Sequence, residues 1–538
     1  MSEIMILDCT LRDGGYINEW NFGERTIKRI ISKLTESKID IIECGFIEEG
    51  DFDPNKSLFE GVERIIDYIG PKSENITYVG MIAQPYIPID KISDCNGRSI
   101  DGIRLTFHEH EVEEALIYGK QLIEKGYKVF IQPVGTTSYS DSGLLELVEK
   151  VNDLKPYAFY LVDTLGIMYK NDLLRMFHLL DNNLVQSISI GFHSHNNLQL
   201  SFSNAQELLM LHTKRNIIID SSVMGMGRGA GNLCTELVTN YINENIEERY
   251  DTIPLLEIID EHLSHIFTET KWGYSIPYYL AAVNSCHPNY ASHLLNKQTI
   301  SVKAINTILK QLPIKKRDLY DKSFIEDLYI NYQSNFVYDA DDLHLIKEMI
   351  SGREILIIGP GKSIELEKEM INNFINRYDP FVCSVNFIPD SYKVDAVFIS
   401  NLKRFESIAD QLTDNVEITA LITTSNITKS KEVPSLTINY SDLLINNPVI
   451  SDNAGLMLIN LFHHLSVKSL YLAGFDGFSI NKNSNYFSAD MNNNAGMENL
   501  IKINEEISDY LLLLGRKINI QFITKTVYSD TAIDTIMQ

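Results

Sequence analysis

The chain has 538 residues, of which 47 are basic and 72 acidic, so its formal net charge is −25. This length exceeds one ordinary hydrophobic core and predicts two or three domains. The acidic surplus argues against a surface that binds nucleic acid or an anionic membrane. Anionic small substrates would then need a locally positive pocket or a metal ion.

The six cysteines are scattered, without a CxxC pair or the spacing of a disulfide framework. We expect them to be reduced and mostly buried. The first residues lead directly into a strand-like segment, with no charged region followed by an apolar one, and no apolar run reaches the length of a membrane span. These features predict a cytoplasmic protein without a membrane span.

Short β-rich runs alternate with amphipathic helical stretches from Ile4 to about Gly225. The expected strands are 4–9, 39–46, 76–82, 102–107, 127–134, 157–163, 188–195 and 217–225. Eight strand–helix repeats favour an α/β fold of the (β/α)8 TIM barrel type, with an open doubly wound sheet as the alternative. We assign residues 1–250 to this barrel.

A helical stretch and a second α/β pattern follow the barrel. Residues 251–345 lose the strand pattern, and we expect a helical extension that closes the barrel. Strand–helix alternation returns in residues 346–538, beginning at "EILIIGPGKS" and continuing through 395–400, 417–423, 469–478 and 519–524. This predicts a separate Rossmann-like α/β domain.

Two histidines in the seventh expected strand form a candidate metal site. His193 and His195 flank Ser194, and the two-residue period of a strand places both imidazoles on one face. Asp13, after the first strand, would add a carboxylate at the same end of the barrel, where barrel enzymes carry their active sites. This mixed nitrogen and oxygen set suits a divalent metal. The alternative is a pair of structural histidines.

Five motifs occur in chain order after the expected strands: "DCTLRDGG", "IECGF", "DTLG", "GFHSHNN" and "GMGRGAGN". In this order they resemble the DRE-TIM metallolyases, which include hydroxymethylglutaryl-CoA lyase, isopropylmalate synthase and 4-hydroxy-2-oxovalerate aldolase. The resemblance covers about residues 4–290. It implies a metal-dependent TIM barrel that breaks or forms a carbon–carbon bond.

The resemblance also implies roles for particular residues. Asp13, His193 and His195 would hold the divalent ion, expected to be Mn²⁺ or Mg²⁺ in preference to Zn²⁺, and Asn232 lies where some relatives supply a further ligand. Arg12 would face the oxygen of a 2-oxo acid or acyl compound that chelates the ion, where a fixed positive charge stabilises an enolate.

Two other features of these motifs leave alternatives open. Glu43 matches the acid of the second motif and is either a polar partner of Arg12 or the substrate, or a member of a buried ion pair. The glycines of "GMGRGAGN" either let the backbone approach a carboxylate or phosphate, or only permit a tight turn.

The acid/base group departs from the family pattern. The oxovalerate aldolases have a histidine after the first motif, whereas this chain has Tyr16. Tyr16 could replace it, and His108 and a tyrosine of "IPYYLAA" (Tyr278 or Tyr279) are the other candidates. A phenol titrates near pH ~10, so it would donate a proton more readily than it would act as a resting base. Any of these side chains could simply pack.

The second domain begins with "ILIIGPGKSIE", a strand, a glycine turn and a helix, an arrangement that points backbone N–H groups at an anion. Together with "CSVNFI" and "NYFSAD", it resembles bacterial sialyltransferases that use a CMP-sugar donor, over about residues 352–530. The resemblance implies that Asn386 contacts the nucleotide and that Tyr486 lies near the donor phosphate.

Other positions depart from the sialyltransferase pattern. The asparagine expected in the glycine turn is Pro360, a tyrosine after "GFDG" is replaced by Phe478, and no histidine lies between residues 487 and 510, where the catalytic base is expected. These departures argue against sugar transfer by that mechanism. They leave nucleotide or nucleotide-sugar binding, or a purely structural domain.

The leading hypothesis is a divalent-metal-dependent lyase or aldolase that acts on a pyruvate-type 2-oxo acid and an aldehyde, in glycan or unusual-sugar biosynthesis. An acyl-CoA-condensing enzyme or lyase of the same superfamily is the first alternative. The second is a nucleotide-sugar binder or transferase with a non-catalytic barrel. We also expect a homo-oligomer.

Overall fold

A computed structural model of the chain describes residues 3–297, 299–317, 319–414, 420–427, 434–479, 485–488 and 497–528. The chain divides into a barrel unit, Met1–Asn289, and a second unit, Tyr290–Gln538. This division differs from the predicted three segments, because the expected helical extension is split between the two units. Its later helices pack on the second unit, where Tyr329 donates a hydrogen bond to Asp452 and Gln333 donates one to Tyr440.

The barrel unit is built on a closed ring of parallel strands. Strand β1 pairs with both β2 and β9, which closes the sheet and excludes the open alternative. The ring consists of β1 Ile4–Asp8, β2 Ile41–Ile47, β4 Thr77–Ala83, β5 Gly102–Phe107, β6 Lys128–Pro133, β7 Ala158–Asp163, β8 Ser189–Ser194 and β9 Ile217–Ser221. A short strand β3 (Leu58–Phe59) adds to β2. The predicted TIM barrel is therefore confirmed, although the last strand ends four residues before the expected Gly225.

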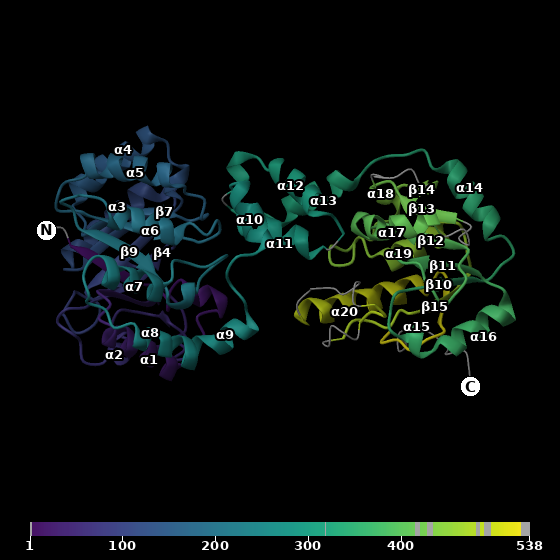
Figure 1. The fold of residues 1–538 in the computed structure, drawn as a ribbon, viewed down its shortest axis with the longest axis horizontal. Coiled ribbons are helices and arrows are strands. Elements are labelled where there is room, and N and C mark those ends of the chain that lie inside the picture. Colours follow the sequence, from purple (N-terminus) through teal and green to yellow (C-terminus); the bar gives the residue numbers. More distant parts are fainter. Residues whose placement is uncertain are drawn as a thin grey trace. The chain divides into compact units, whose positions relative to one another are not determined.

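Amphipathic helices surround this ring (Figure 1). In α1 (Glu24–Glu36), the buried residues are Ile27, Ile30, Ile31 and Leu34, which recur at the spacing of one helix face. The others are α2 Ile66–Ile69, α3 Val112–Glu124, α4 Asp141–Leu154, α5 Lys170–Asn183, α6 Ser201–Leu209 and α7 Thr235–Asn245. Their apolar faces and the outer side of the strands form the main hydrophobic core.

Side chains that alternate along the strands fill the inside of the barrel. On β5, Ile103 and Leu105 face the outer core, whereas Arg104 between them is fully buried and paired with residues of other strands. An apolar cluster that includes Leu7, Val79 and Phe130 fills another part of the interior. The barrel thus contains a charged layer beside an apolar one, which is unusual because a buried charge needs a partner.

Helices continue after the barrel strands in both units. The barrel unit adds α8 Ile253–Ile258, α9 Ser264–Glu269 and α10 Ile276–Val283, followed by α11 Pro288–Asn296, α12 Val302–Lys310, α13 Lys322–Gln333 and α14 Ala340–Met349. In the part of the chain that the structure describes, none of the helices has the length and apolar character needed to cross a membrane.

The second unit contains a parallel sheet with helices on both faces (Figure 1). Its strands are β10 Ile355–Ile358, β11 Phe381–Val385, β12 Ala396–Ile399, β13 Ala420–Thr424, β14 Leu436–Ile438, β15 Ser469–Ala473 and β16 Asn519–Phe522, in the order β14-β13-β12-β11-β10-β15-β16. The helices are α15 Ser363–Leu366, α16 Lys368–Tyr378, α17 Leu402–Asp414, α18 Tyr440–Leu443, α19 Ala454–His464 and α20 Met497–Leu514. This confirms the second α/β fold; residues 417–419 of one predicted strand lie outside the described residues.

Candidate active site

Three side chains meet at the carboxyl ends of the barrel strands, one from the beginning of the barrel sequence and two from its later part. Asp13 follows β1, His193 lies on β8, and His195 is one residue beyond it. Each offers a ligand atom within 4.8 Å of the other two. Asp13 and His193 are buried, so the cluster lies inside the protein at the end of the barrel where such enzymes carry out their chemistry.

The two imidazoles are oriented by hydrogen bonds from their Nδ1 atoms. His193 Nδ1 donates to Asp220 Oδ2 over 2.9 Å, and His195 Nδ1 donates to the carbonyl oxygen of Thr164 over 2.7 Å. Since both partners are acceptors, each Nε2 keeps a lone pair. The buried Nε2 of His195 lies 3.4 Å from Asp13 Oδ2 and makes no hydrogen bond within the described residues. An orphaned nitrogen beside a carboxylate fits a divalent ion.

Asn232 joins this cluster from the loop after β9. Its Nδ2 donates to Asp13 Oδ2 over 2.6 Å and to the carbonyl oxygen of Met226 over 3.1 Å. Its Oδ1 is buried and has no partner in the described parts of the chain. The structure therefore brings together all four residues that the sequence predicted for the metal site.

The electrostatics of the cluster favour an ionised Asp13. Burial opposes its charge, but Arg12 and the two histidines outweigh that effect and hold the pKa of Asp13 well below its usual value. Burial lowers the pKa of His193 despite Asp220. At His195, burial lowers the pKa, but the neighbouring Asp13 carboxylate outweighs that effect and raises it. A carboxylate and a neutral His193 are the forms that bind a metal.

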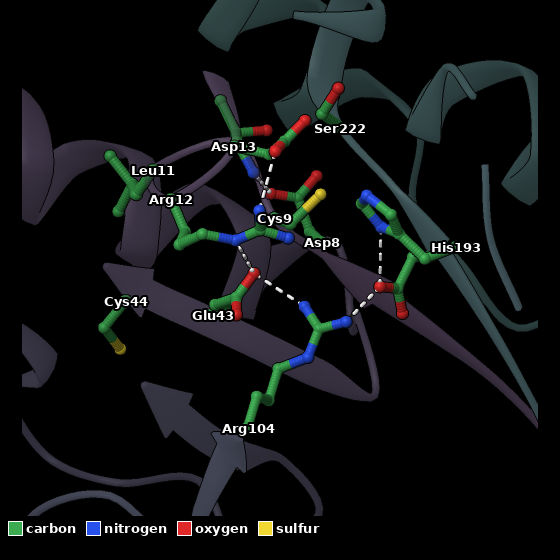
Figure 2. Close-up of polar contacts among 12 residues, drawn as sticks. Asp8, Cys9, Leu11, Arg12, Asp13, Glu43, Cys44, Arg104, His193 and Ser222 are labelled. Carbon is green, nitrogen blue, oxygen red and sulfur yellow. Dashed lines mark hydrogen bonds and ion pairs between the residues drawn. The ribbon is translucent and has the colours of Figure 1, made fainter. Parts of the chain in front are cut away.

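A chain of buried ion pairs supports the cluster from below (Figure 2). Arg12 donates from Nη1 to Asp13 Oδ1 over 2.6 Å and from Nε to Glu43 Oε2 over 2.9 Å. The same Glu43 oxygen accepts from Arg104 Nη1 over 2.6 Å, and Arg104 Nη2 pairs with Asp220. Glu43 is thus both a polar partner of Arg12 and a member of a buried ion pair, so the two sequence interpretations hold together. The chain fixes Arg12 beside the cluster.

The sequence analysis missed Arg104 and Asp220. Each lies in the middle of an otherwise apolar strand, in "GIRLTF" and "IIIDSS". Charges of opposite sign in buried strands are a signal that could have identified them, because such charges need partners. Asp220 orients His193, and a carboxylate in this place supports many metal-binding histidines.

Tyr16 lies in the turn after β1, in an aromatic group with Trp20 and Phe46. Its ring centroid is 4.7 Å from that of Trp20 and 6.2 Å from that of Phe46. Arg12 lies over the Phe46 ring at 5.8 Å. Burial raises the pKa of Tyr16 even though Arg12 opposes that shift, so its hydroxyl stays protonated at neutral pH.

The other acid/base candidates are not joined to the cluster. His108 follows β5; its backbone N–H donates to Glu111 and its ring stacks on that of His110. Tyr279 on α10 is exposed and packs edge-on against Tyr274. Burial raises the pKa of Tyr278. Among the described residues, no hydrogen bond or ion pair joins these three side chains to Asp13, His193 or His195.

The glycine loop after β9 is a tightly packed turn. A Cβ on Gly227 would lie 2.2 Å from Asn232 Nδ2 and 2.9 Å from Asp13 Oδ2, and one on Gly231 would lie 2.0 Å from the carbonyl oxygen of Gly225. Gly231 also has a φ of +83°. Glycine is needed here so that the backbone can pass directly beside the cluster, which supports the tight-turn interpretation.

The second unit has a cavity of about 330 Å³ at the carboxyl ends of its strands. It lies where the strand order reverses, between the loops after β10 and β15, the usual ligand position in such sheets. Asn386 and Tyr486 both line it. Asn386 has a φ of +63°, and Tyr486 packs edge-on against Phe478 at 6.2 Å.

The glycine turn of the second unit does not aim its amides at a ligand. The backbone N–H of Ser363 donates to Asp476 Oδ2 over 2.8 Å, and the Ser363 hydroxyl donates to the same carboxylate. The predicted anion is therefore a side chain of the protein itself. Sequence reasoning missed this because Asp476 lies 113 residues away.

An eight-stranded parallel barrel with an Asp/His/His cluster at its strand ends defines a TIM barrel with a candidate metal site. Residues 106–260 match the model of the HMGL-like family, so the barrel unit carries an HMGL-like domain. This confirms the resemblance of the barrel to that family, and the matched residues contain the last three of the five motifs.

The chain is also similar to individual proteins. It is 25% identical over 238 residues to oxaloacetate decarboxylase of Mycobacterium tuberculosis, covering 43% of this chain and 67% of that protein. It is 25% identical over 272 residues to 4-hydroxy-2-oxovalerate aldolase of Marinomonas sp., covering 48% and 77%. Among solved structures, the HMG-CoA lyase of Brucella melitensis covers 48% of this chain and 96% of its own, at 15% identity and a TM-score of 0.38.

Proposed function

We propose that this protein is a divalent-metal-dependent carbon–carbon lyase or aldolase that acts on a pyruvate-type 2-oxo acid. The observation that carries the proposal is the cluster of Asp13, His193 and His195, in which the buried Nε2 of His195 has no hydrogen-bond partner within the described residues. The HMGL-like domain, and relatives named as an aldolase and a decarboxylase of 2-oxo acids, point to the same lyase-type chemistry.

Asp13, His193 and His195 would hold the ion, with Asn232 Oδ1 as a further ligand. Two oxygen and two nitrogen donors without a thiolate suit Mn²⁺ or Mg²⁺ better than a structural zinc site. When bound, the ion supplies Lewis-acid stabilisation of negative charge on the 2-oxo acid.

The chain's own residues contribute charge and proton transfer. Arg12 is held by Asp13 and Glu43, and its Nη2 makes no hydrogen bond within the described residues, so it could donate to the oxo oxygen, where negative charge develops in the enolate. Tyr16, protonated at neutral pH, would donate a proton to the aldehyde oxygen. His108 and Tyr279 stay predicted alternatives for this role.

Exchange of the pyruvate methyl protons tests the proposal. In D₂O with Mg²⁺ or Mn²⁺, the purified protein is expected to exchange these protons for deuterium. The exchange is measured by NMR after EDTA has removed the metal from the finished reaction. As a control, EDTA added at the start is expected to prevent the exchange. No exchange, with turnover of an acyl-CoA instead, would favour the acyl-CoA enzyme of the same superfamily.

We further propose that the second unit binds a nucleotide or nucleotide-sugar, which would place the enzyme in glycan or unusual-sugar biosynthesis. The cavity at the strand-order reversal, lined by Asn386, Tyr486, Lys403 and Arg404, supports this second function. Titration calorimetry with CMP is expected to show binding that Asn386→Ala weakens. Equal affinity of the wild type and Asn386→Ala for CMP would argue against nucleotide binding in this cavity.

The compartment is the last part of the proposal. All six cysteines are free, and four of them are buried, as expected of thiols in a reducing compartment such as the cytoplasm. A homo-oligomer stays a prediction.

A further inference from the structure

An arginine of the glycine loop stands at the exposed side of the candidate active site. Arg228 follows Gly227, whose backbone passes directly beside Asp13 and Asn232. Its guanidinium carbon lies 5.3 Å from the centre of the Tyr16 ring, and its Nη2 donates to His287 Nε2 over 3.0 Å. A row of side chains thus leads from Arg12 over Phe46 and Tyr16 to this second arginine.

The backbone around Arg228 is fixed by its neighbours. Asn197 Oδ1 accepts the backbone N–H of Ala230 over 2.9 Å, and Gly229 has a φ of +71° and packs so closely that a Cβ would lie 2.9 Å from the same oxygen. The N–H of Gly231 donates to the carbonyl oxygen of Arg228 over 3.1 Å. The position of Arg228 is therefore set by the same loop that shapes the metal site.

The two arginines differ in charge balance. Arg12 is compensated by Asp13 and Glu43, whereas Arg228 forms no ion pair with any carboxylate of the described residues. The only hydrogen-bond partner of its guanidinium among the described residues is His287. Burial and the charge of Arg228 lower the pKa of His287 to about 4, so that its imidazole is neutral. A guanidinium carries five N–H donors, and most of those of Arg228 are left for a ligand.

We propose that Arg228 binds the anionic group of the acceptor aldehyde, a carboxylate or a phosphate, at the end remote from the reacting carbonyl. This inference rests on the proposed aldolase function and adds the substrate class. A planar guanidinium that stacks on Tyr16 presents its edge as a fork for such oxygens. A single positive charge at the mouth of the site would also attract an anion to a protein of net charge −25.

The remote anion belongs to the aldehyde because the inner site is taken by the 2-oxo acid. Arg12 and Asp13 are buried, whereas Tyr16 is 41% exposed and Arg228, which lies against its ring, is exposed. In the addition, a C3–H bond of pyruvate breaks, C3 bonds to the aldehyde carbon, and the aldehyde oxygen takes up a proton, so that one proton is released to solvent for each one taken up. The reverse reaction breaks that bond, and neither direction needs a further reactant.

Anion binding without catalysis gives the first test. Titration calorimetry of the whole protein with succinate or glycerol 3-phosphate is expected to give dissociation constants that rise about 10–100-fold in Arg228→Gln and less in Arg228→Lys. Arg98→Gln removes the same charge from an exposed side chain before β5, at the opposite end of the barrel, and serves as the matched control. The two ligands show whether a carboxylate or a phosphate is preferred.

Kinetics give the second test. With pyruvate, the ratio of kcat/KM for succinic semialdehyde over pentanal, or for glyceraldehyde 3-phosphate over glyceraldehyde, is expected to fall about 10–100-fold in Arg228→Gln. The inference would be overturned if kcat/KM fell equally with charged and neutral aldehydes. A raised KM for pyruvate in the exchange assay, or an unchanged affinity for the anions, would also overturn it. Absence of pyruvate exchange in the wild type, with Arg228-dependent anion binding, would instead overturn the proposed function alone.

Discussion

Replacing Asp13 by asparagine is expected to abolish the metal-dependent exchange of pyruvate methyl protons. The substitution keeps the shape of the side chain but removes the only carboxylate of the cluster, which pairs with Arg12 over 2.6 Å and lies 3.4 Å from His195 Nε2. A metal ion in such a site stabilises the negative charge that develops on the substrate by about several kcal/mol. We therefore expect the exchange rate to fall by about 10³-fold or more, since each 1.4 kcal/mol is tenfold.

Metal affinity and a matched control separate this effect from a loss of folding. Titration with Mn²⁺ is expected to show much weaker binding in Asp13→Asn. Asp94→Asn makes the same change at a side chain that is 82% exposed and is expected to leave both exchange and affinity as in the wild type. Exchange that survives Asp13→Asn but disappears in Asn386→Ala would mean that the second unit carries the activity and the barrel is only a scaffold.

Much of the barrel and its metal site could be predicted because both depend on local sequence. The two-residue period of a strand places His193 and His195 on one face whatever lies around them. The order of the strand-end motifs then brings the turn that holds Asp13 to the same end of the barrel. Close packing of the last loop against Asn232 and Asp13 requires glycine in that loop, so this contact can also be inferred from the glycines of the sequence.

The contacts that sequence reasoning missed join residues far apart in the chain. Asp220 accepts from His193, and it also pairs with Arg104, which lies 116 residues away. Only the register of the closed sheet makes these side chains neighbours. Tyr279, by contrast, is a residue that the sequence analysis proposed for the site. The rotation of its helix about the helix axis decides whether its side chain faces the site or the solvent. In the structure, its side chain is 43% exposed.

The glycine turn of the second unit shows how a local motif can mislead. "GPGKS" has the form of an anion-binding turn, and its amides do bind a carboxylate, but that carboxylate is the side chain of Asp476. Burial raises the pKa of Asp476 even though the hydrogen bonds from Ser363 oppose that shift. The motif was correct about the charge and wrong about its source.

Replacing Arg104 by methionine is expected to destabilise the barrel unit strongly. Arg104 is fully buried and is the shared partner of Glu43 and Asp220. Removing one member of a buried ion-pair network leaves carboxylates without a compensating charge, which costs about 3–5 kcal/mol. Methionine fills a similar volume, so the loss would come from charge and not from a cavity.

The two tryptophans of the chain make this loss measurable in the barrel alone. Trp20 and Trp272 both lie in the barrel unit, so their fluorescence during urea unfolding follows that unit. Arg64→Met, at an arginine that is 50% exposed and pairs with Glu60, is the control and is expected to cost about 1 kcal/mol or less. Adding Asp220→Asn to Arg104→Met is expected to recover part of the stability, because one stranded carboxylate is neutralised. A loss no larger than that of the control would mean that the network is not needed to balance Glu43 and Asp220, and the fixed position of Arg12 would then need another cause.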